Sequence, residues 1–394
     1  MSWQEWLGSA LWVVRQIRRP APKSTLVIPC TSAGSLGDQA MLDVLVGQLV
    51  ARGHKVRFLE YNRPFFHLRH HVELVDLSSL GSRWRKAMAV IRELLAVEHC
   101  TYLGADVLND RYGGTQEHLD ILRVAQAAGV QVHVQGFSLE HDSGPVTSRQ
   151  LRALSSADMM IRDPVSFAHS EAFGFKNRRL VSDMAFLLTP SVDGSSANAL
   201  MEQVHRWKAD GQFILGVNVS GPTLTMMPGG VGLIAKAIGD WLSQSERHRT
   251  VLLSHDVRSG AAGDSEALAA ILDQLPENLR QRALLLDDSA MAWELKQLCG
   301  SLDLVVTGRM HLAIASMGMT TPVLCLAYMG KFRGLMEHIG IDTMVVDPQS
   351  IGSSDDLLAV IGRLQRDSVT LREKLAAKLP EIRDMSQGNF HWVR

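Results

Sequence analysis

The chain has 394 residues, of which 46% are hydrophobic and 21% charged, and its formal net charge is -1. This is the composition of a folded globular protein, and the length allows two domains of ordinary size. A nearly neutral chain has no overall field that would attract nucleic acid, so no nucleic acid partner is expected and any anion site must be local. Cys30, Cys100, Cys299 and Cys325 form no CxxC pair, and we interpret them as buried thiols in a reducing compartment.

Residues 1–22 form an amphipathic segment in which tryptophans and other apolar residues precede the basic ones. A signal peptide has the opposite order. Two interpretations stay open: a helix docked on the first domain, or an interfacial helix whose tryptophans contact a membrane surface. No apolar run reaches the roughly 18 residues of a membrane span. We therefore expect a cytoplasmic protein, and a position at the inner face of the membrane stays open.

From residue 23 onward, apolar runs alternate with segments of helical periodicity. In the first domain, 23–190, the expected strands are 25–30, 54–61, 101–106, 130–138 and 158–163. Pro190, Gly194 and nearby serines indicate a linker at 191–210. The second domain, 211–370, repeats the alternation with expected strands at 213–220, 250–256, 283–288, 303–308, 321–328 and 343–347. A C-terminal helix follows at 371–394, and its return to the first domain stays open.

This β-α-β alternation predicts parallel sheets covered by helices. The fold class is therefore α/β, with two Rossmann-like, doubly wound domains facing each other across a cleft. In such sheets, ligands bind at the carboxyl ends of the strands. The polar residues that close each strand are thus the candidate site residues.

In the second domain, Arg309, His311 and Lys331 follow two neighbouring strands. Each has an ordinary explanation: a guanidinium paired at a helix end, a core histidine and a solvated lysine. Together they predict a pocket for a compact, highly charged anion. Ser220 and His255 close two further strands and are assigned to the same pocket.

In the first domain, "SAGSLGDQAM" contains a tight turn at Gly37 and a carboxylate at Asp38, without the spacing of a phosphate-binding loop. Asp38 is either a helix N-cap or a catalytic group. Because a carboxylate repels phosphate, this domain is expected to receive a neutral, hydroxyl-rich ligand. Gly104, Asp106 and Asn109 close another strand and join Gly37 and Asp38 as candidate acceptor-binding residues.

Several segments resemble the polysaccharide pyruvyl transferase family: "SLGDQAML", "GADVL", "IRDPVS", "VSDMAFLL" and, above all, "DLVVTGRMHLAIASMGMTTPVLCLAYMGKFRGLMEHIG". The resemblance spans roughly residues 26–347. It implies a GT-B-like pair of Rossmann domains. It also implies transfer of an enolpyruvyl unit from phosphoenolpyruvate to two hydroxyls of one sugar in a polysaccharide or glycolipid precursor, which forms a pyruvate ketal and releases phosphate.

By the same resemblance, Arg309 and Lys331 contact the anionic groups of the donor, and Arg162 is a further donor contact. His311 corresponds to the acid-base residue, since a histidine can donate a proton in one step and accept one in another. Asp38 then orients or deprotonates an acceptor hydroxyl. We expect no metal and no cofactor, with phosphoenolpyruvate as co-substrate. For Arg162, beside Asp163, an internal ion pair is the alternative.

The first turn lacks the asparagine that relatives often have before the Gly-Asp pair, and Ala105 replaces a common glycine. Both departures concern the acceptor, whose identity stays open, as does the oligomeric state. Two other functions remain: a GT-B glycosyltransferase using a nucleotide sugar, with Glu337 as ribose-binding carboxylate, or a non-catalytic saccharide-binding protein.

Overall fold

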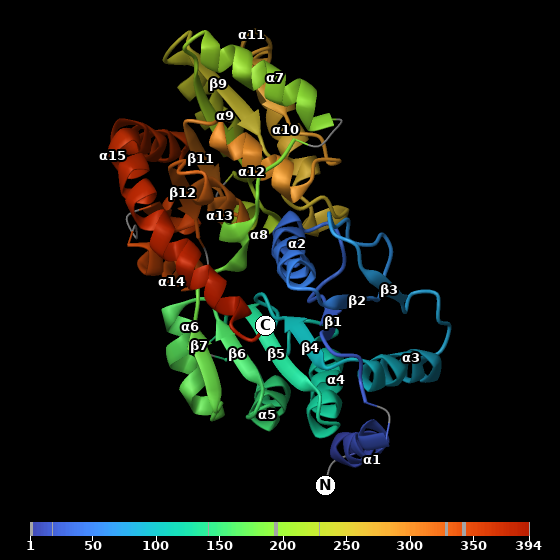
Figure 1. Ribbon diagram of the computed structural model, residues 1–394. Coiled ribbons are helices and arrows are strands. Elements are labelled where there is room, and N and C mark those ends of the chain that lie inside the picture. The colour runs from blue at the N-terminus through green and yellow to red at the C-terminus, as the bar shows by residue number, and fades with distance from the viewer. Residues whose placement is uncertain are drawn as a thin grey trace. The chain divides into compact units, whose positions relative to one another are not determined.

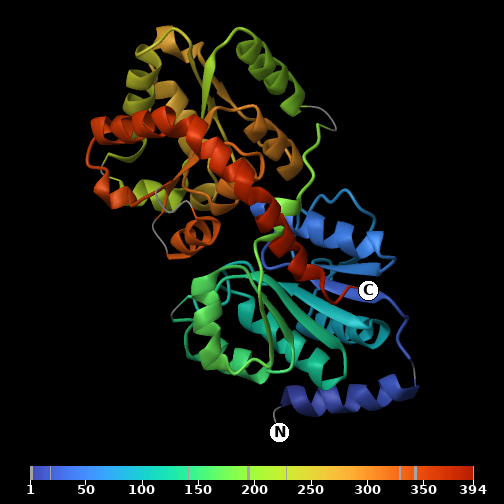
Figure 2. The same cartoon turned by 60° about the vertical axis from the view of Figure 1, so that its left-hand side comes forward.

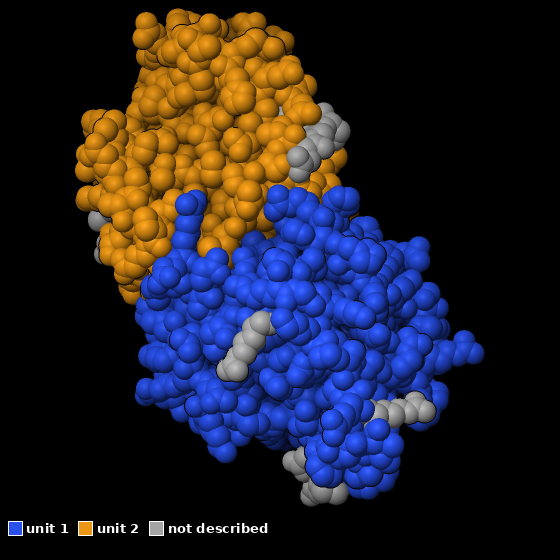
Figure 3. Space-filling view, viewed as in Figure 1, with its two compact units in different colours: residues 1–33, 41–184, 383–394 blue, residues 34–40, 185–382 orange. Residues whose placement is uncertain are grey.

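The computed structural model describes residues 3–17, 19–140, 142–192, 196–227, 229–327, 330–340 and 344–393. The chain divides into two compact units (Figure 3). Unit 1 comprises Met1–Ala33, Met41–Met184 and Arg383–Arg394, and unit 2 comprises Gly34–Ala40 and Ala185–Ile382. Each unit contains one parallel sheet, which confirms the α/β class and the two Rossmann-like sheets.

The sheet of unit 1 has seven strands in the order β3-β2-β1-β4-β5-β6-β7 (Figure 1). The strands are β1 (Ser24–Ile28), β2 (Lys55–Glu60), β3 (Glu73–Asp76), β4 (His99–Leu103), β5 (Gln131–Phe137), β6 (Asp158–Ile161) and β7 (Asn177–Leu180). β1 and β4 are buried along their whole length because they lie at the centre. The strand order reverses between them.

Two strands of unit 1 were not expected from the sequence. β3 and β7 are the edges of the sheet, and their side chains are exposed or half-buried. An edge strand needs no continuous apolar run, so "ELVD" and "NRRL" carry little local signal.

One helix of unit 1 precedes its first strand, and the others connect its strands (Figures 1 and 2). They are α1 (Trp3–Ile17), α2 (Leu36–Ala51), α3 (Arg83–Ala96), α4 (Thr115–Ala127), α5 (Pro145–Ala153) and α6 (Pro164–His169). The first turn of α2 lies within unit 2 and the remainder of the helix within unit 1. Because the strand order runs both ways from β1 and parallel connections are generally right-handed, the helices lie on both faces of the sheet.

The sheet of unit 2 repeats this plan in the order β10-β9-β8-β11-β12-β13. Its strands are β8 (Phe213–Val217), β9 (His248–Leu252), β10 (Ala283–Leu285), β11 (Leu304–Thr307), β12 (Val323–Leu326) and β13 (Val345–Val346). All six correspond to strands predicted from the sequence. Here the order reverses between β8 and β11, so the loops after these two strands occupy the usual ligand-binding edge.

The helices of unit 2 are α7 (Ser196–Ala209), α8 (Gly221–Met226), α9 (Gly230–Ser243), α10 (Ser265–Gln274), α11 (Glu277–Arg280), α12 (Ala292–Gly300), α13 (Met310–Gly318), α14 (Gly330–Ile339) and α15 (Ser354–Gln387). α7 occupies much of the stretch expected to be a linker. Its buried residues Met201, Val204 and Trp207 follow helical spacing and anchor it in the unit.

The end of α15 and the residues after it belong to unit 1. Gln135 donates a 2.6 Å hydrogen bond to the backbone oxygen of Asn389, whose side-chain amide donates to Ser182 O at 2.9 Å. The four cysteines are buried and form no disulfide, as predicted. Among the described residues, none of the helices combines the length and apolar character that crossing a lipid bilayer requires.

Candidate active site

The loops after β8 and β11 are joined by direct hydrogen bonds at the carboxyl edge of the unit 2 sheet. The backbone N–H of Asn218 donates to Val306 O at 2.8 Å, and Thr307 Oγ1 donates to the side-chain oxygen Asn218 Oδ1 at 2.8 Å. The amide of Arg309 in turn donates to Thr307 Oγ1 at 2.9 Å. Arg309 is the N-cap residue of α13, so its position is set by both strands and by the helix.

The Arg309 guanidinium is held by two carboxylates. Its Nε and Nη2 donate to Asp264 Oδ1 at 3.0 and 2.6 Å, and Nη1 lies 3.4 Å from Asp256 Oδ2. The side chain is 20% exposed. Arg258 also pairs with Asp256. Two guanidinium groups thus face two carboxylates, so Arg309 is oriented by its neighbours and its charge is largely balanced.

Asp264 is the centre of this network and was not identified from the sequence. It is fully buried and accepts hydrogen bonds from Asn218 Nδ2 at 2.8 Å and from the backbone amides of His255 and Asp256 at 3.2 and 3.1 Å. Burial raises the pKa of Asp264, and the Arg309 guanidinium opposes this shift. In the sequence, Asp264 is a helix-cap residue ahead of α10, which gives no sign of a partner far along the chain.

The segment before α2 runs along the β9 loop. Ser35 and Asp256 form an antiparallel bridge, flanked by hydrogen bonds from the Leu36 amide to His255 O at 3.1 Å and from the Val257 amide to Gly34 O at 2.9 Å. Gly34 has a φ of +115°, which L side chains rarely adopt. Gly37 and Asp38, expected on the acceptor side with the first domain, therefore lie in unit 2.

Gly37 packs directly on the His311 imidazole. A Cβ atom added to Gly37 would lie 2.3 Å from His311 Nδ1 and 2.5 Å from Cγ, so only glycine allows this approach. His311 is the second residue of α13 and is half-buried. The first turn of α2 thus forms one wall of the histidine site.

His255 lies parallel to His311, with ring centroids 6.5 Å apart and planes within 3°. Burial lowers the pKa of His255 well below its ordinary value, and His311, Arg309 and Arg258 add to the shift. His255 is therefore neutral at physiological pH. Of the two imidazoles, His311 is the one with access to solvent.

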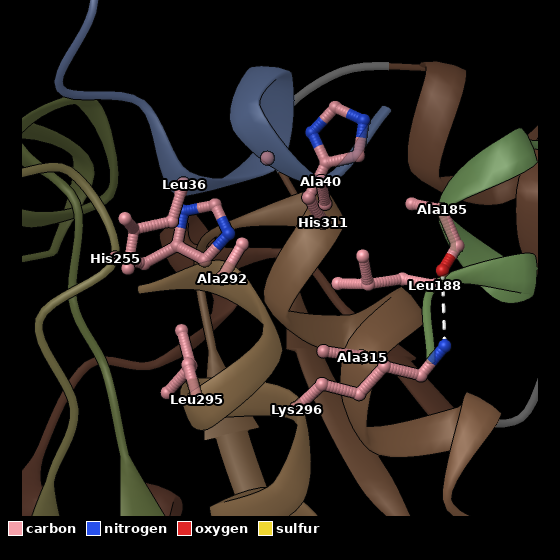
Figure 4. A pocket seen from close by; sticks show the side chains of 11 residues that line it. Leu36, Ala40, Ala185, Leu188, His255, Ala292, Leu295, Lys296, His311 and Ala315 are labelled. Carbon is pink, nitrogen blue, oxygen red and sulfur yellow. Dashed lines mark hydrogen bonds between the residues drawn. The ribbon is translucent and has the colours of Figure 1, made fainter. Parts of the chain in front are cut away.

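The two histidines line a small cavity with a volume of about 10 Å³, the room of one water molecule (Figure 4). Leu36 and Gly37 of α2, Ala292 of α12 and His311 of α13 all come from the first turns of their helices. Helix N-termini carry partial positive charge. Three of them converge on this cavity; those of α2 and α12 also carry the carboxylates of Asp38 and Glu294, whereas the first turn of α13 carries none.

Lys296 also lines the cavity and was not identified from the sequence. It is 1% exposed, and its Nζ donates to Ala185 O and Phe186 O, both at 3.0 Å. Figure 4 shows it bonded to Ala185 on the side of the cavity away from the imidazoles. A lysine within an amphipathic helix is usually solvated. The burial of Lys296 therefore follows from the packing of α12 and could not be predicted from the sequence.

Three other candidates lie in unit 2. Ser220 is buried and caps α8 by accepting from the Thr223 amide, with the two hydroxyl oxygens 2.8 Å apart. Asp38 is not the N-cap of α2, because Ser35 takes that position and accepts from the Asp38 amide at 3.3 Å. Asp38 is instead a buried residue of the first helical turn. Lys331 is in α14, and its side chain lies outside the described residues.

Gly104, Asp106 and Asn109 follow β4 in unit 1, at the reversal point of that sheet. A Cβ on Gly104 would lie 2.6 Å from Phe137 Cβ, so this glycine serves close packing. Asn109 is buried, and its Oδ1 accepts from the Arg111 amide at 2.9 Å. Asp106 is half-buried.

Arg162 forms an internal ion pair in unit 1. Its Nη1 donates to Asp183 Oδ2 at 2.8 Å and its Nε to Ser138 Oγ at 2.9 Å, and the side chain is 3% exposed. The partner is Asp183, whereas Asp163 caps α6. The geometry favours the structural alternative for Arg162 over contact with a donor.

The fold is of the GT-B type. The chain is similar to the UDP-GlcNAc 2-epimerase from Neisseria meningitidis bound to UDP-GlcNAc, with a TM-score of 0.61, 12% identity, and coverage of 92% of this chain and 97% of that one. It is similar to a ugt transferase from Siraitia grosvenorii in complex with UDP, with a TM-score of 0.58, 12% identity, and coverage of 94% and 98%. At this identity the similarity concerns the fold alone. No curated protein sequence matches the chain.

Residues 36–329 match the family model of polysaccharide pyruvyl transferases. The match includes the first turn of α2, the β9 loop and the Arg309–His311 segment, and it covers well over half of the chain. The chain therefore belongs to the polysaccharide pyruvyl transferase family. It is a transferase of the class that moves pyruvyl groups to polysaccharides.

Proposed function

We propose that the chain transfers the enolpyruvyl unit of phosphoenolpyruvate to two hydroxyls of one sugar, forming a cyclic pyruvate ketal and releasing phosphate. The observation that carries this proposal is the position of His311, a half-buried imidazole at the N-terminus of α13, packed against Gly37. It pairs a proton carrier with a positively polarised helix end. An enol phosphate that must be protonated at carbon needs both.

The anionic donor is proposed to bind at the first turn of α13, with Lys331 as a further cation, and the first turn of α2, which carries Asp38, is left to the acceptor. The cavity of about 10 Å³ is too small for the whole donor, so we place at most one of its oxygens there, beside His255. Because Asp264 and Asp256 balance the charge of Arg309, we propose that Arg309 orients the donor through its exposed edge and adds little net attraction.

The chemistry begins when an acid protonates the methylene carbon of phosphoenolpyruvate, which builds positive character at the neighbouring carbon. One sugar hydroxyl attacks that carbon and gives up its proton. The carbon–oxygen bond to phosphate breaks, phosphate leaves, and the second hydroxyl closes the ketal with loss of its own proton. His311 is the proposed proton carrier. Asp38 is the proposed orienting group for an acceptor hydroxyl, with Asp106 as a further acceptor contact.

Thermal denaturation of the full chain with candidate donors tests the proposal. Phosphoenolpyruvate should raise Tm, whereas UDP-sugars should not. Incubation with phosphoenolpyruvate and simple glycosides should then give a pyruvyl mass increment with matching phosphate release. A Tm increase from UDP-sugars alone would favour the glycosyltransferase, whose fold is shared by the UDP-bound neighbours. Saccharide binding with no turnover of any donor would favour the non-catalytic alternative.

A further inference from the structure

Helix α1 packs on unit 1 through a face that contains the buried Leu11 together with small and polar residues. A Cβ on Gly8 would lie 2.3 Å from Ala127 Cβ of α4, and Gln4 Nε2 donates to Asp120 Oδ1 at 2.8 Å. The buried Arg15 donates through Nη1 to Leu94 O and Val97 O, at 2.6 and 2.7 Å, and so caps the end of α3. α1 is therefore a docked part of unit 1.

The opposite face of α1 is apolar and exposed. Trp6, Ala10, Val13 and Ile17 follow the i, i+4, i+7, i+11 spacing of one helical stripe. Trp6 is 64% exposed, Val13 54% and Ile17 81%. Both ribbon views place α1 at the outer edge of unit 1, on the far side of α4 from the sheet (Figures 1 and 2). This arrangement inverts that of an ordinary surface helix, which buries its apolar stripe.

An exposed cation follows this stripe. Arg19 is exposed two residues after Ile17. Arg15 contacts the C-terminal end of α3, whereas the exposed Trp84 and Arg85 lie at the other end of that helix. An exposed tryptophan, an apolar stripe and an arginine on one helix match the boundary between lipid headgroups and acyl chains, where the cation complements anionic headgroups.

We propose that the outer face of α1 docks unit 1 on an anionic phospholipid surface, with α1 parallel to the membrane plane. The occupant is a lipid bilayer, since Arg19 next to the exposed Trp6–Ile17 stripe complements headgroup phosphates better than a second copy of a nearly neutral chain. If the proposed pyruvyl transfer also holds, the surface implies an acceptor sugar carried on a lipid. The docking itself does not depend on that function.

The full chain tests this by flotation with vesicles made of equal parts phosphatidylglycerol and phosphatidylcholine. The unmodified protein should float with these vesicles at low salt, less with pure phosphatidylcholine, and less at about 0.5 M salt. The double variant Trp6→Glu/Ile17→Glu should lose about tenfold or more in apparent affinity, because two apolar side chains can no longer be buried. Val369→Glu, at an apolar residue of α15 that is 69% exposed, is the matched control and should float like the unmodified chain.

Tm of each variant shows whether unit 1 stays folded, and a second double variant, Trp6→Ser/Ile17→Ser, should lose affinity in the same direction. Failure of the unmodified chain to float, or equal flotation of the Trp6/Ile17 variants, would overturn the proposal. So would a concentration-dependent dimer that these substitutions dissolve, because a second copy would then be the occupant. Phosphoenolpyruvate-induced Tm shifts, measured without vesicles, report on the proposed function separately.

Discussion

Gly37 and His311 are separated by most of the chain, yet a Cβ on Gly37 would lie 2.3 Å from His311 Nδ1. The first turn of α2 is therefore a wall of the histidine site. This contact links the weakest motif in the sequence, a Gly-Asp turn, to the most specific one, "GRMH".

Gly37→Ala should displace the imidazole and reduce kcat by about a hundredfold, since small misplacements of a reacting group have effects of that size. Steady-state kinetics with phosphoenolpyruvate check this. Gly239→Ala in α9 is the control, because its Cβ would make only an ordinary contact of 3.7 Å with Pro276 Cδ. The control should keep full activity and gain slightly in stability. Equal activity of both variants would show that the position of His311 is unimportant.

His311→Ala should lower turnover by about two to four orders of magnitude, the usual contribution of a general acid-base group. Binding of phosphoenolpyruvate, measured by calorimetry, should be largely retained. His255→Gln is the comparison within the same cavity. Because the His255 imidazole is neutral and buried, this variant should lose much less turnover than His311→Ala. A fully active His311→Ala variant would refute the acid-base assignment.

Arg309→Ala should destabilise the protein by about 3 kcal/mol, because the fully buried Asp264 loses its main partner. Chemical denaturation measures the loss. The double variant Arg309→Ala/Asp264→Asn should recover part of it, since no unpaired carboxylate remains. If Arg309 acted only as a solvated donor contact, the single variant would keep its stability and lose only affinity for phosphoenolpyruvate.

Stability should fall in mild acid because of a histidine cluster in unit 1. His99 Nδ1 lies 3.1 Å from His133 Nε2, and His133 Nδ1 lies 3.0 Å from Asp158 Oδ2. Burial lowers the pKa of His99, and the neighbouring His133 adds to this shift, which takes the pKa from 6.5 to about 4. Glu98 opposes this shift, and His54 contributes to it. Burial also lowers the pKa of His133, with Asp158 opposing.

The unfolded chain therefore takes up a proton at His99 near pH 6.5, which the folded chain resists until about pH 4. The stabilisation is fully present above pH 6.5 and is lost as the pH falls through this window. His99 alone should reduce the free energy of unfolding by about 2 kcal/mol between pH 7 and pH 5. Urea unfolding at both pH values measures this. In His99→Gln the difference should shrink, and an unchanged slope would exclude His99 as its source.

By itself, the sequence determined the α/β class, eleven of the strands and the family. These depend on local signals: buried parallel strands are continuous apolar runs, and motifs such as "GRMH" are contiguous. Strand-end positions also placed Arg309 and His311 at the ligand-binding edge, because parallel topology gathers carboxyl ends. The edge strands β3 and β7 lacked such a signal, since solvent covers one side of each.

Only the tertiary structure decided the partners of the charged residues. Asp264 lies 45 residues before Arg309 and holds it, Asp183 rather than the adjacent Asp163 pairs with Arg162, and Lys296 is buried against two carbonyls. The same holds for Gly37 beside His311 and for the face of α1 that remains exposed. A charge or a helical stripe can be read along the chain, but its partner is selected by which elements pack together, and that depends on contacts between residues far apart in the sequence.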